Sequence, residues 1–255
     1  MFKENKDQEQ EKKRLQFNSI YSTYNRKGFE EGNVENSKVE FDLNIEEDAK
    51  IFQRVYELDW PIVKDVKITC HKSLDNESNG QVKKWLKENF PEKTETFVLK
   101  GAVNKETNSI NEYVDEIWKV SKWVEQSVHI CNFDINHRQL QRLFTAYNHI
   151  ERMRYNLCIF TDGFDAPFMI EENLSYNISN LSFLDSKIPS FEVLLKFIAS
   201  NDSLRTGLRQ IDFSGTGADQ GENARQIENA RNELSFDKEI QVEIGPDASG
   251  RCGNQ

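Results

Sequence analysis

Along most of the chain, short stretches of alternating apolar and polar residues precede stretches in which apolar residues recur every three or four positions. The alternation predicts β-strands with one buried face, and the wider spacing predicts amphipathic helices. Successive alternating pairs start 31, 31, 25, 28, 30 and 31 residues apart, about 29 on average. A fixed period of this size indicates a repeat architecture. The pairs are Val66/Ile68, Phe97/Leu99, Val128/Ile130, Met153/Tyr155, Leu181/Phe183, Ile211/Phe213 and Val242/Ile244.

The segments between these pairs carry one apolar stripe each, as a helix packed on a core should. The clearest stripes are Val82, Trp85, Leu86, Phe90; Ile110, Tyr113, Val114, Ile117; Leu140, Leu143, Phe144, Tyr147; and Phe191, Leu194, Leu195, Ile198. Asn136 precedes the third stripe and is expected to cap its helix. The unit between residues 158 and 180 contains Gly163 and Pro167, so whether it is a regular repeat stays open.

Two architectures stack strand–helix units: a doubly wound sheet with helices on both faces, and a curved solenoid with helices on one side. Strands covered on both faces read as continuous apolar runs, whereas strands with one exposed face alternate. Five of the seven pairs enclose a charged residue or a histidine. The pattern therefore favours an α/β fold built as a βα solenoid.

The leucine-rich-repeat core has the pattern L-x-x-L-x-L-x-x-N/C. Ile150, Met153, Tyr155 and Cys158 match it, and the pairs at Leu181 and Ile211 match it loosely. The chain therefore resembles the leucine-rich-repeat superfamily, specifically its ribonuclease-inhibitor-like subtype, over about residues 60–245. It is most similar to divergent families of ciliated protists whose biochemical roles are mostly unassigned. Leucine is often replaced by Val, Ile, Phe or Met, and the regular Asn column is absent.

Composition narrows the class of protein. The chain has 255 residues, a net charge of −10 and no apolar run long enough for a membrane helix, so neither nucleic acid nor membrane is an expected partner. The N-terminal MFKENKDQEQEKKR has no apolar stretch, so no secretory signal is expected. Four dispersed cysteines fit no disulfide framework or zinc spacing. We expect a reduced, cytoplasmic protein without cofactor or metal.

Residues 1–50 carry 21 charged side chains. Such a segment buries too little apolar surface to offset its ordering entropy. The predicted organisation is a charged tail over residues 1–50, disordered or partly helical, followed by a leucine-rich-repeat-like solenoid over residues 51–255.

Three features of the sequence are candidate sites of chemistry. Gly215, Gly217 and Gly221 follow a predicted strand, a spacing that resembles a dinucleotide-binding loop, but only one further strand follows them. His129 and Cys131 share one strand face and could form half of a metal site, but His137 and His149 lie at opposite ends of one predicted helix, too far apart to complete it. Cys70, Cys131 and Cys158 each follow a strand pair and are expected to be core or near-core thiols.

We therefore expect a non-catalytic protein–protein interaction module, a scaffold rather than an enzyme. Its partner would bind the concave strand face, on which the residues between the paired apolar positions line up from basic to acidic. These binding residues are Lys67, Val98, His129, Arg154, Ser182, Asp212 and Glu243. Two alternatives stay open: a small α/β nucleotide-binding enzyme that uses the 211–221 loop, and a structural protein that oligomerises through its N-terminal tail.

Overall fold

Within each of two compact parts of the chain, strands pair in the order in which they occur along the sequence. The computed structural model describes residues 8, 11–12, 15–17, 19–20, 38–58, 60, 63–73, 76–101, 111–161, 174–233 and 240–244. These strands are β1 Lys38–Asp42, β2 Asp65–Thr69, β3 Thr94–Lys100, β4 Val124–Cys131, β6 Arg152–Asn156, β8 Asn180–Leu184, β9 Gln210–Asp212 and β10 Gln241–Glu243. Every pairing whose register is described is parallel. This confirms the predicted α/β class with a parallel sheet.

Helices connect most of these strands. They are α2 Glu46–Val55, α3 Glu77–Glu88, α4 Asn111–Val120, α5 His137–Ala146, α6 Phe191–Ala199, α7 Asp202–Gly207 and α8 Gly221–Glu233, with a 3-10 turn, η2, at Ser121–Trp123. Two short strands, β5 Asp134–Asn136 and β7 Ile159–Thr161, form a separate parallel pair. Asn136 caps α5 as expected, because its side chain accepts a hydrogen bond from the Gln139 N–H.

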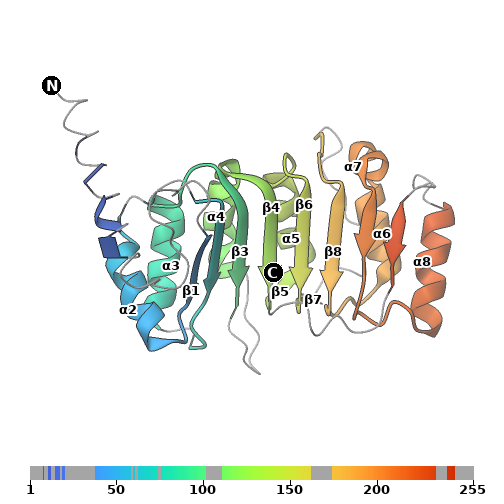
Figure 1. Cartoon of the computed structure of the whole chain (residues 1–255). Coiled ribbons are helices and arrows are strands. Elements are labelled where there is room, and N and C mark those ends of the chain that lie inside the picture. Colours follow the sequence, from blue (N-terminus) through green and yellow to red (C-terminus); the bar gives the residue numbers. More distant parts are fainter. Residues whose placement is uncertain are drawn as a thin grey trace. The chain divides into compact units, whose positions relative to one another are not determined.

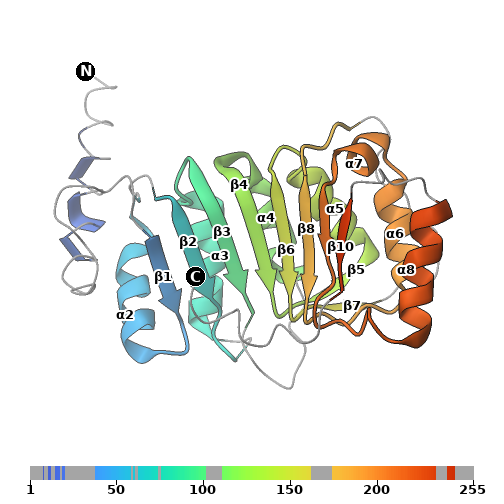
Figure 2. The same cartoon turned by 45° about the vertical axis from the view of Figure 1, so that its right-hand side comes forward.

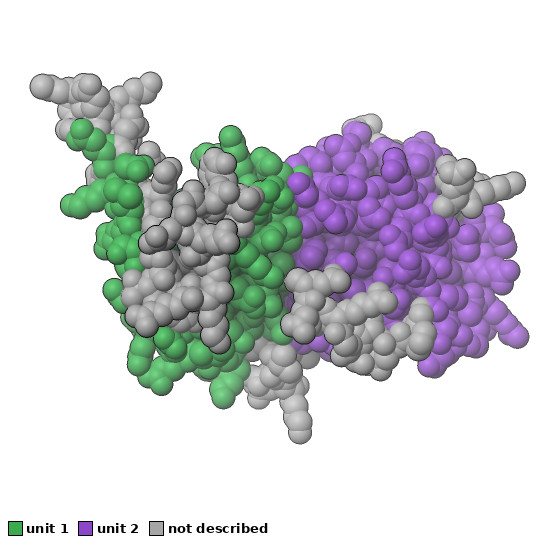
Figure 3. All heavy atoms as spheres, viewed as in Figure 1, with its two compact units in different colours: residues 1–105, 115–125 green, residues 106–114, 126–255 purple. Residues whose placement is uncertain are grey.

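The chain divides into two compact units, coloured separately in Figure 3. Unit 1 comprises Met1–Lys105 and Asp115–Glu125, and unit 2 comprises Glu106–Val114 and Gln126–Gln255. Unit 1 contains β1, β2 and β3, with α2 and α3 on one face of these strands (Figure 2). Its core is aromatic: the rings of Trp60 and Trp85 lie 4.7 Å apart, and Phe52 contacts both.

The predicted boundary between tail and folded region, at residue 51, falls inside α2. Strand β1 and the start of α2 belong to unit 1, and Val39 and Phe41 are fully buried there. Phe17 is also buried, with its ring 5.0 Å from that of Trp60. The high charge density of residues 1–50 obscured these few apolar anchors. Of the rest of the predicted tail before β1, residues 8, 11–12, 15–16 and 19–20 are helical, and the others lie outside the described residues.

Unit 2 contains β6, β8, β9, β10 and most of β4, with α5, α6 and α8 on one face of the strands (Figures 1 and 2). Across both units, six of the seven predicted apolar pairs are buried. The seventh differs: Val242 is half-buried and Ile244 is 42% exposed. Strand β10 is the last strand in the sheet order, so no described strand covers its outer edge.

One backbone position just past the strands of unit 2 recurs in the left-handed conformation. Asn132, Leu157, Asp185 and Gly215 have φ values of 60°, 53°, 48° and 74°. The register places these residues in successive repeats, because Cys131 pairs with Asn156, Asn156 pairs with Leu184, and the Asp185 N–H donates to the Ser214 carbonyl. The repeats therefore share backbone conformation as well as hydrophobic period. Residues 162–173 of the uncertain fourth repeat lie outside the described residues.

Candidate partner-binding face

The strand register brings the seven predicted binding residues together within each unit. In unit 1, Lys67 pairs with Val98. In unit 2, a continuous row runs across five strands from β4 to β10, and we call it the central row: His129, Arg154, Ser182, Asp212 and Glu243. On β4, β6, β8 and β9 the apolar neighbours of the row are buried. Because side chains alternate along a strand, they point away from the row, toward the face on which Figure 2 shows the helices.

Glu40 on β1 lies beside Lys67 and Val98 in unit 1, and the alternating pairs did not predict it. Glu40 pairs with Lys67 in the register, and its carboxylate forms an ion pair with the Lys67 ammonium. The expected basic beginning of the charge gradient is therefore neutralised within unit 1. The motif Val39-Glu40-Phe41, which starts 27 residues before Val66, carries the signal that could have identified this strand.

The basic part of the central row is centred on β6. Arg154 is exposed and makes no hydrogen bond or ion pair with any residue that the structure describes. Arg152, two residues earlier on the same face, is also exposed, and its guanidinium lies 3.5 Å from the Gln126 side-chain oxygen. Burial, followed by the positive charges of Arg154 and Arg152, lowers the pKa of His129 to about 4. His129 is therefore neutral at pH 7, and the two arginines supply the positive charge.

The acidic part of the central row lies on β9 and β10. Asp212 is only 7% exposed, and its Oδ1 accepts hydrogen bonds from the Ser214 N–H at 2.9 Å and hydroxyl at 2.6 Å. Glu243 is exposed, and its Oε1 accepts from the Gln210 amide at 2.9 Å. Asp212 therefore stabilises its own turn, and Glu243 is the more accessible carboxylate.

The glycines of the 211–221 loop have left-handed backbones, since Gly215, Gly217 and Gly221 have φ values of 74°, 75° and 41°. A Cβ added to Gly215 would lie 2.0 Å from Oδ1 of Asp185. The space that the missing side chain opens is thus occupied by a carboxylate. A phosphate at that position would be repelled, and the loop connects β9 to α8.

None of the described cysteines is exposed to solvent. Cys70 and Cys158 are buried, Cys131 is half-buried, and Cys252 lies outside the described residues. Burial raises the pKa of the Cys158 thiol to about 12. A thiol that stays protonated at neutral pH is a poor nucleophile. Within the described ranges, no three His, Cys, Asp or Glu side chains gather as metal ligands would.

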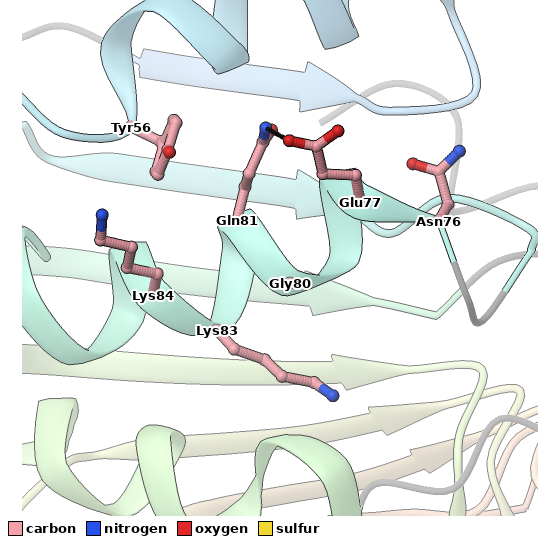
Figure 4. A pocket seen from close by; sticks show the side chains of 7 residues that line it. All are labelled: Tyr56, Asn76, Glu77, Gly80, Gln81, Lys83 and Lys84. Atoms are coloured by element: carbon pink, nitrogen blue, oxygen red, sulfur yellow. Dashed lines mark hydrogen bonds between the residues drawn. The ribbon is translucent and has the colours of Figure 1, made fainter.

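A separate pocket of about 390 Å³ lies beside α3 in unit 1 (Figure 4). Lys84 forms an ion pair with Glu57 and lies 5.6 Å from the centre of the Tyr56 ring. The Gln81 side-chain oxygen is buried and has no hydrogen-bond partner among the described residues. Because Glu57 compensates the charge of Lys84, the pocket offers little net attraction for an anion. Its lining is Tyr56, Asn76, Glu77, Gly80, Gln81, Lys83 and Lys84.

No protein-family model, curated protein or solved structure matches the chain significantly. The leucine-rich-repeat resemblance therefore rests on the motifs and the strand order alone. Over the ranges that the structure describes, no helix is both long and apolar enough to cross a bilayer.

Proposed function

We propose that the chain is a leucine-rich-repeat-like βα solenoid and that the strand face of unit 2 binds a protein partner without catalysing a reaction. The observation that carries the proposal is the central row: five strands place one outward side chain each in register on a face that bears no described helix. Parallel strands in chain order with helices on one side are what stacked βα repeats produce.

Hydrogen bonds between successive repeats also support stacking. Cys158 occupies the Asn/Cys position of the repeat pattern, and its thiol donates to the Ile130 carbonyl of the preceding repeat at 3.4 Å. Ser186, one repeat later, accepts from the Cys158 N–H at 3.1 Å and donates to the Leu184 carbonyl at 3.0 Å. A thiol and a hydroxyl thus join neighbouring repeats where the regular pattern would use asparagine.

Charge on the face supports binding rather than catalysis. Arg154 and Glu243 are exposed at separate points, so each can form an ion pair with a partner that is complementary in charge. His129 lies near two arginines, which favour its neutral form, and no carboxylate among its electrostatic neighbours would orient it as a general base. A nucleotide-binding activity of the glycine loop is disfavoured by Asp185, as described above.

A pair of charge swaps tests the proposal. In the variant Arg154→Glu/Glu243→Lys, both exposed charges of the central row are reversed without altering the net charge. The matched control is Glu222→Lys/Arg225→Glu on α8, where both side chains are more than two-thirds exposed. Asp212 is left unchanged because its replacement would remove the hydrogen bonds of its turn.

We expect a protein captured from extract by the wild type to be retained by the α8 variant and lost by the central-row variant, as quantified by mass spectrometry. Circular dichroism and thermal unfolding should show that both variants fold. A captured protein that is retained equally by both variants would place binding elsewhere and overturn the proposal.

A further inference from the structure

The partner's chemistry follows from where the accessible charges of the central row lie. We propose that this row binds an extended segment of the partner, running across the strands, in which a carboxylate side chain and a basic side chain are four residues apart. The inference rests on the proposed function and specifies the ligand of the same face.

The anionic side chain of the segment would lie on β6. Arg152 and Arg154 project from the same face of this strand, and neither forms an ion pair with another described residue. Both guanidiniums are therefore available to a carboxylate, for which the planar, multiply donating guanidinium is well suited. Val128 and Met153, the apolar neighbours of the row on β4 and β6, point to the opposite face and are buried.

The basic side chain of the segment would lie on β10. Glu243 is exposed, and its Oε1 accepts one hydrogen bond, from Gln210. A carboxylate has two oxygens and several acceptor positions, so Glu243 can also accept from an ammonium or guanidinium. Asp212, in the adjacent position of the row, contributes negative charge from a buried side chain that is fixed by Ser214.

The spacing fixes the geometry of the segment. From β6 to β10 the row passes β8 and β9 and so crosses three gaps between neighbouring strands. At the usual strand separation, the positions on β6 and β10 are roughly 14 Å apart. An extended chain advances roughly 3.3 Å per residue. The two charged residues of a bound segment that spans this distance are therefore about four positions apart. Residues i and i+4 of an extended segment point to the same side, so both charged side chains can face the sheet.

The residues between the two charged positions suit a neutral stretch of the segment. Ser182 is half-buried and has a short side chain. The Asp212 side chain is buried and hydrogen-bonded to Ser214. Three residues with small or neutral side chains would therefore fit between the carboxylate and the basic group. A helical segment fits less well, because its rise of roughly 1.5 Å per residue would require about nine residues to span the same distance.

Synthetic peptides test this inference on the full chain. The probes are end-capped peptides of serine and threonine that carry one glutamate and one lysine two, four or six positions apart, immobilised on a surface. The expected result is retention that peaks at the four-position spacing. Peptides with two glutamates or two lysines at that spacing should be retained about two- to fivefold less, which is the range for one exposed ion pair.

Single charge reversals supply the decisive comparison. Glu243→Lys should shift the preference to the peptide with two glutamates, and Arg154→Glu should shift it to the peptide with two lysines. The α8 variant Glu222→Lys should retain the wild-type preference. Equal retention of all spacings, no retention of any peptide, or a preference that both reversals leave unchanged would overturn the inference.

The outcome is separable from that of the proposed function. If the peptides show no preference but the captured protein is still lost by Arg154→Glu/Glu243→Lys, the face binds a partner in another way. If both experiments show no effect of the central-row charges, the proposed function fails with the inference.

Discussion

At the scale of single residues, the geometry of the chain explains side chains whose roles the sequence leaves ambiguous. Gly215 could serve a phosphate or a turn; its φ of 74° and the closeness of Asp185 assign it to the turn. Likewise, His129 could be a metal ligand or a strand residue, and burial beside two arginines makes it a neutral strand residue. Each assignment leads to a measurable consequence.

Replacing Gly215 with alanine should destabilise unit 2. The new Cβ would meet Asp185 Oδ1 at 2.0 Å in a left-handed backbone conformation that L-residues disfavour. We expect a loss of about 2 kcal/mol in the free energy of unfolding, measured by urea denaturation. The control is Gly80→Ala in α3, where a Cβ meets nothing within 4 Å and helix propensity should raise stability by up to about 1 kcal/mol. Equal effects of the two substitutions would contradict the assignment.

Stability should also depend on pH through His129. Its pKa is about 4 in the folded chain and near 6.5 when unfolded, so on acidification the unfolded chain takes up this proton first. The free energy of unfolding should therefore fall as the pH decreases from about 6.5 toward 4. Between about pH 7.5 and pH 5 this group contributes a loss of about 2 kcal/mol.

The variant His129→Gln isolates this contribution, since all other titrating groups are shared with the wild type. Urea denaturation at both pH values should show a smaller acid-induced loss for the variant. The same loss in both proteins would mean that His129 is not held neutral by its surroundings.

At the scale of elements, the hydrophobic period predicted most of the strands and helices that bury two or more apolar residues at fixed spacing. The stripes of α3, α5 and α6 and six strand pairs are examples. β1 was missed because a five-residue strand within a highly charged segment gives a weak signal. The central row could be predicted, since alternation alone decides which side chains leave the core. The strand register decides which charged side chains become neighbours. The pairing of Glu40 with Lys67 therefore could not be predicted from the alternation.

The N-terminal segment around Phe17 should contribute to the stability of unit 1. Phe17 is fully buried and packs against the Trp60 ring. Phe17→Ala should lower the free energy of unfolding by about 3 kcal/mol, as for other large buried aromatic side chains. Leu15→Ala, at a position that is 59% exposed, is the control and should change it by less than about 0.5 kcal/mol. Urea denaturation followed by tryptophan fluorescence measures both, and equal values would mean that Phe17 does not pack on the core.

At the scale of the whole molecule, the chain combines a large acidic excess with a strand face of mixed charge. The net charge is −10, yet Arg152 and Arg154 are both exposed on the face of unit 2. General electrostatic attraction to polyanions is therefore opposed, while local attraction to one carboxylate remains.

Site-specific photo-crosslinking tests the central claim most directly. A diazirine-bearing residue in place of Ser182 lies in the middle of the central row, and one in place of Glu228 lies on the exposed surface of α8. With a partner that the wild type captures, irradiation should produce a covalent adduct from position 182 and none from position 228. An adduct from position 228, with none from position 182, would show that the partner binds the helix side and would contradict the account.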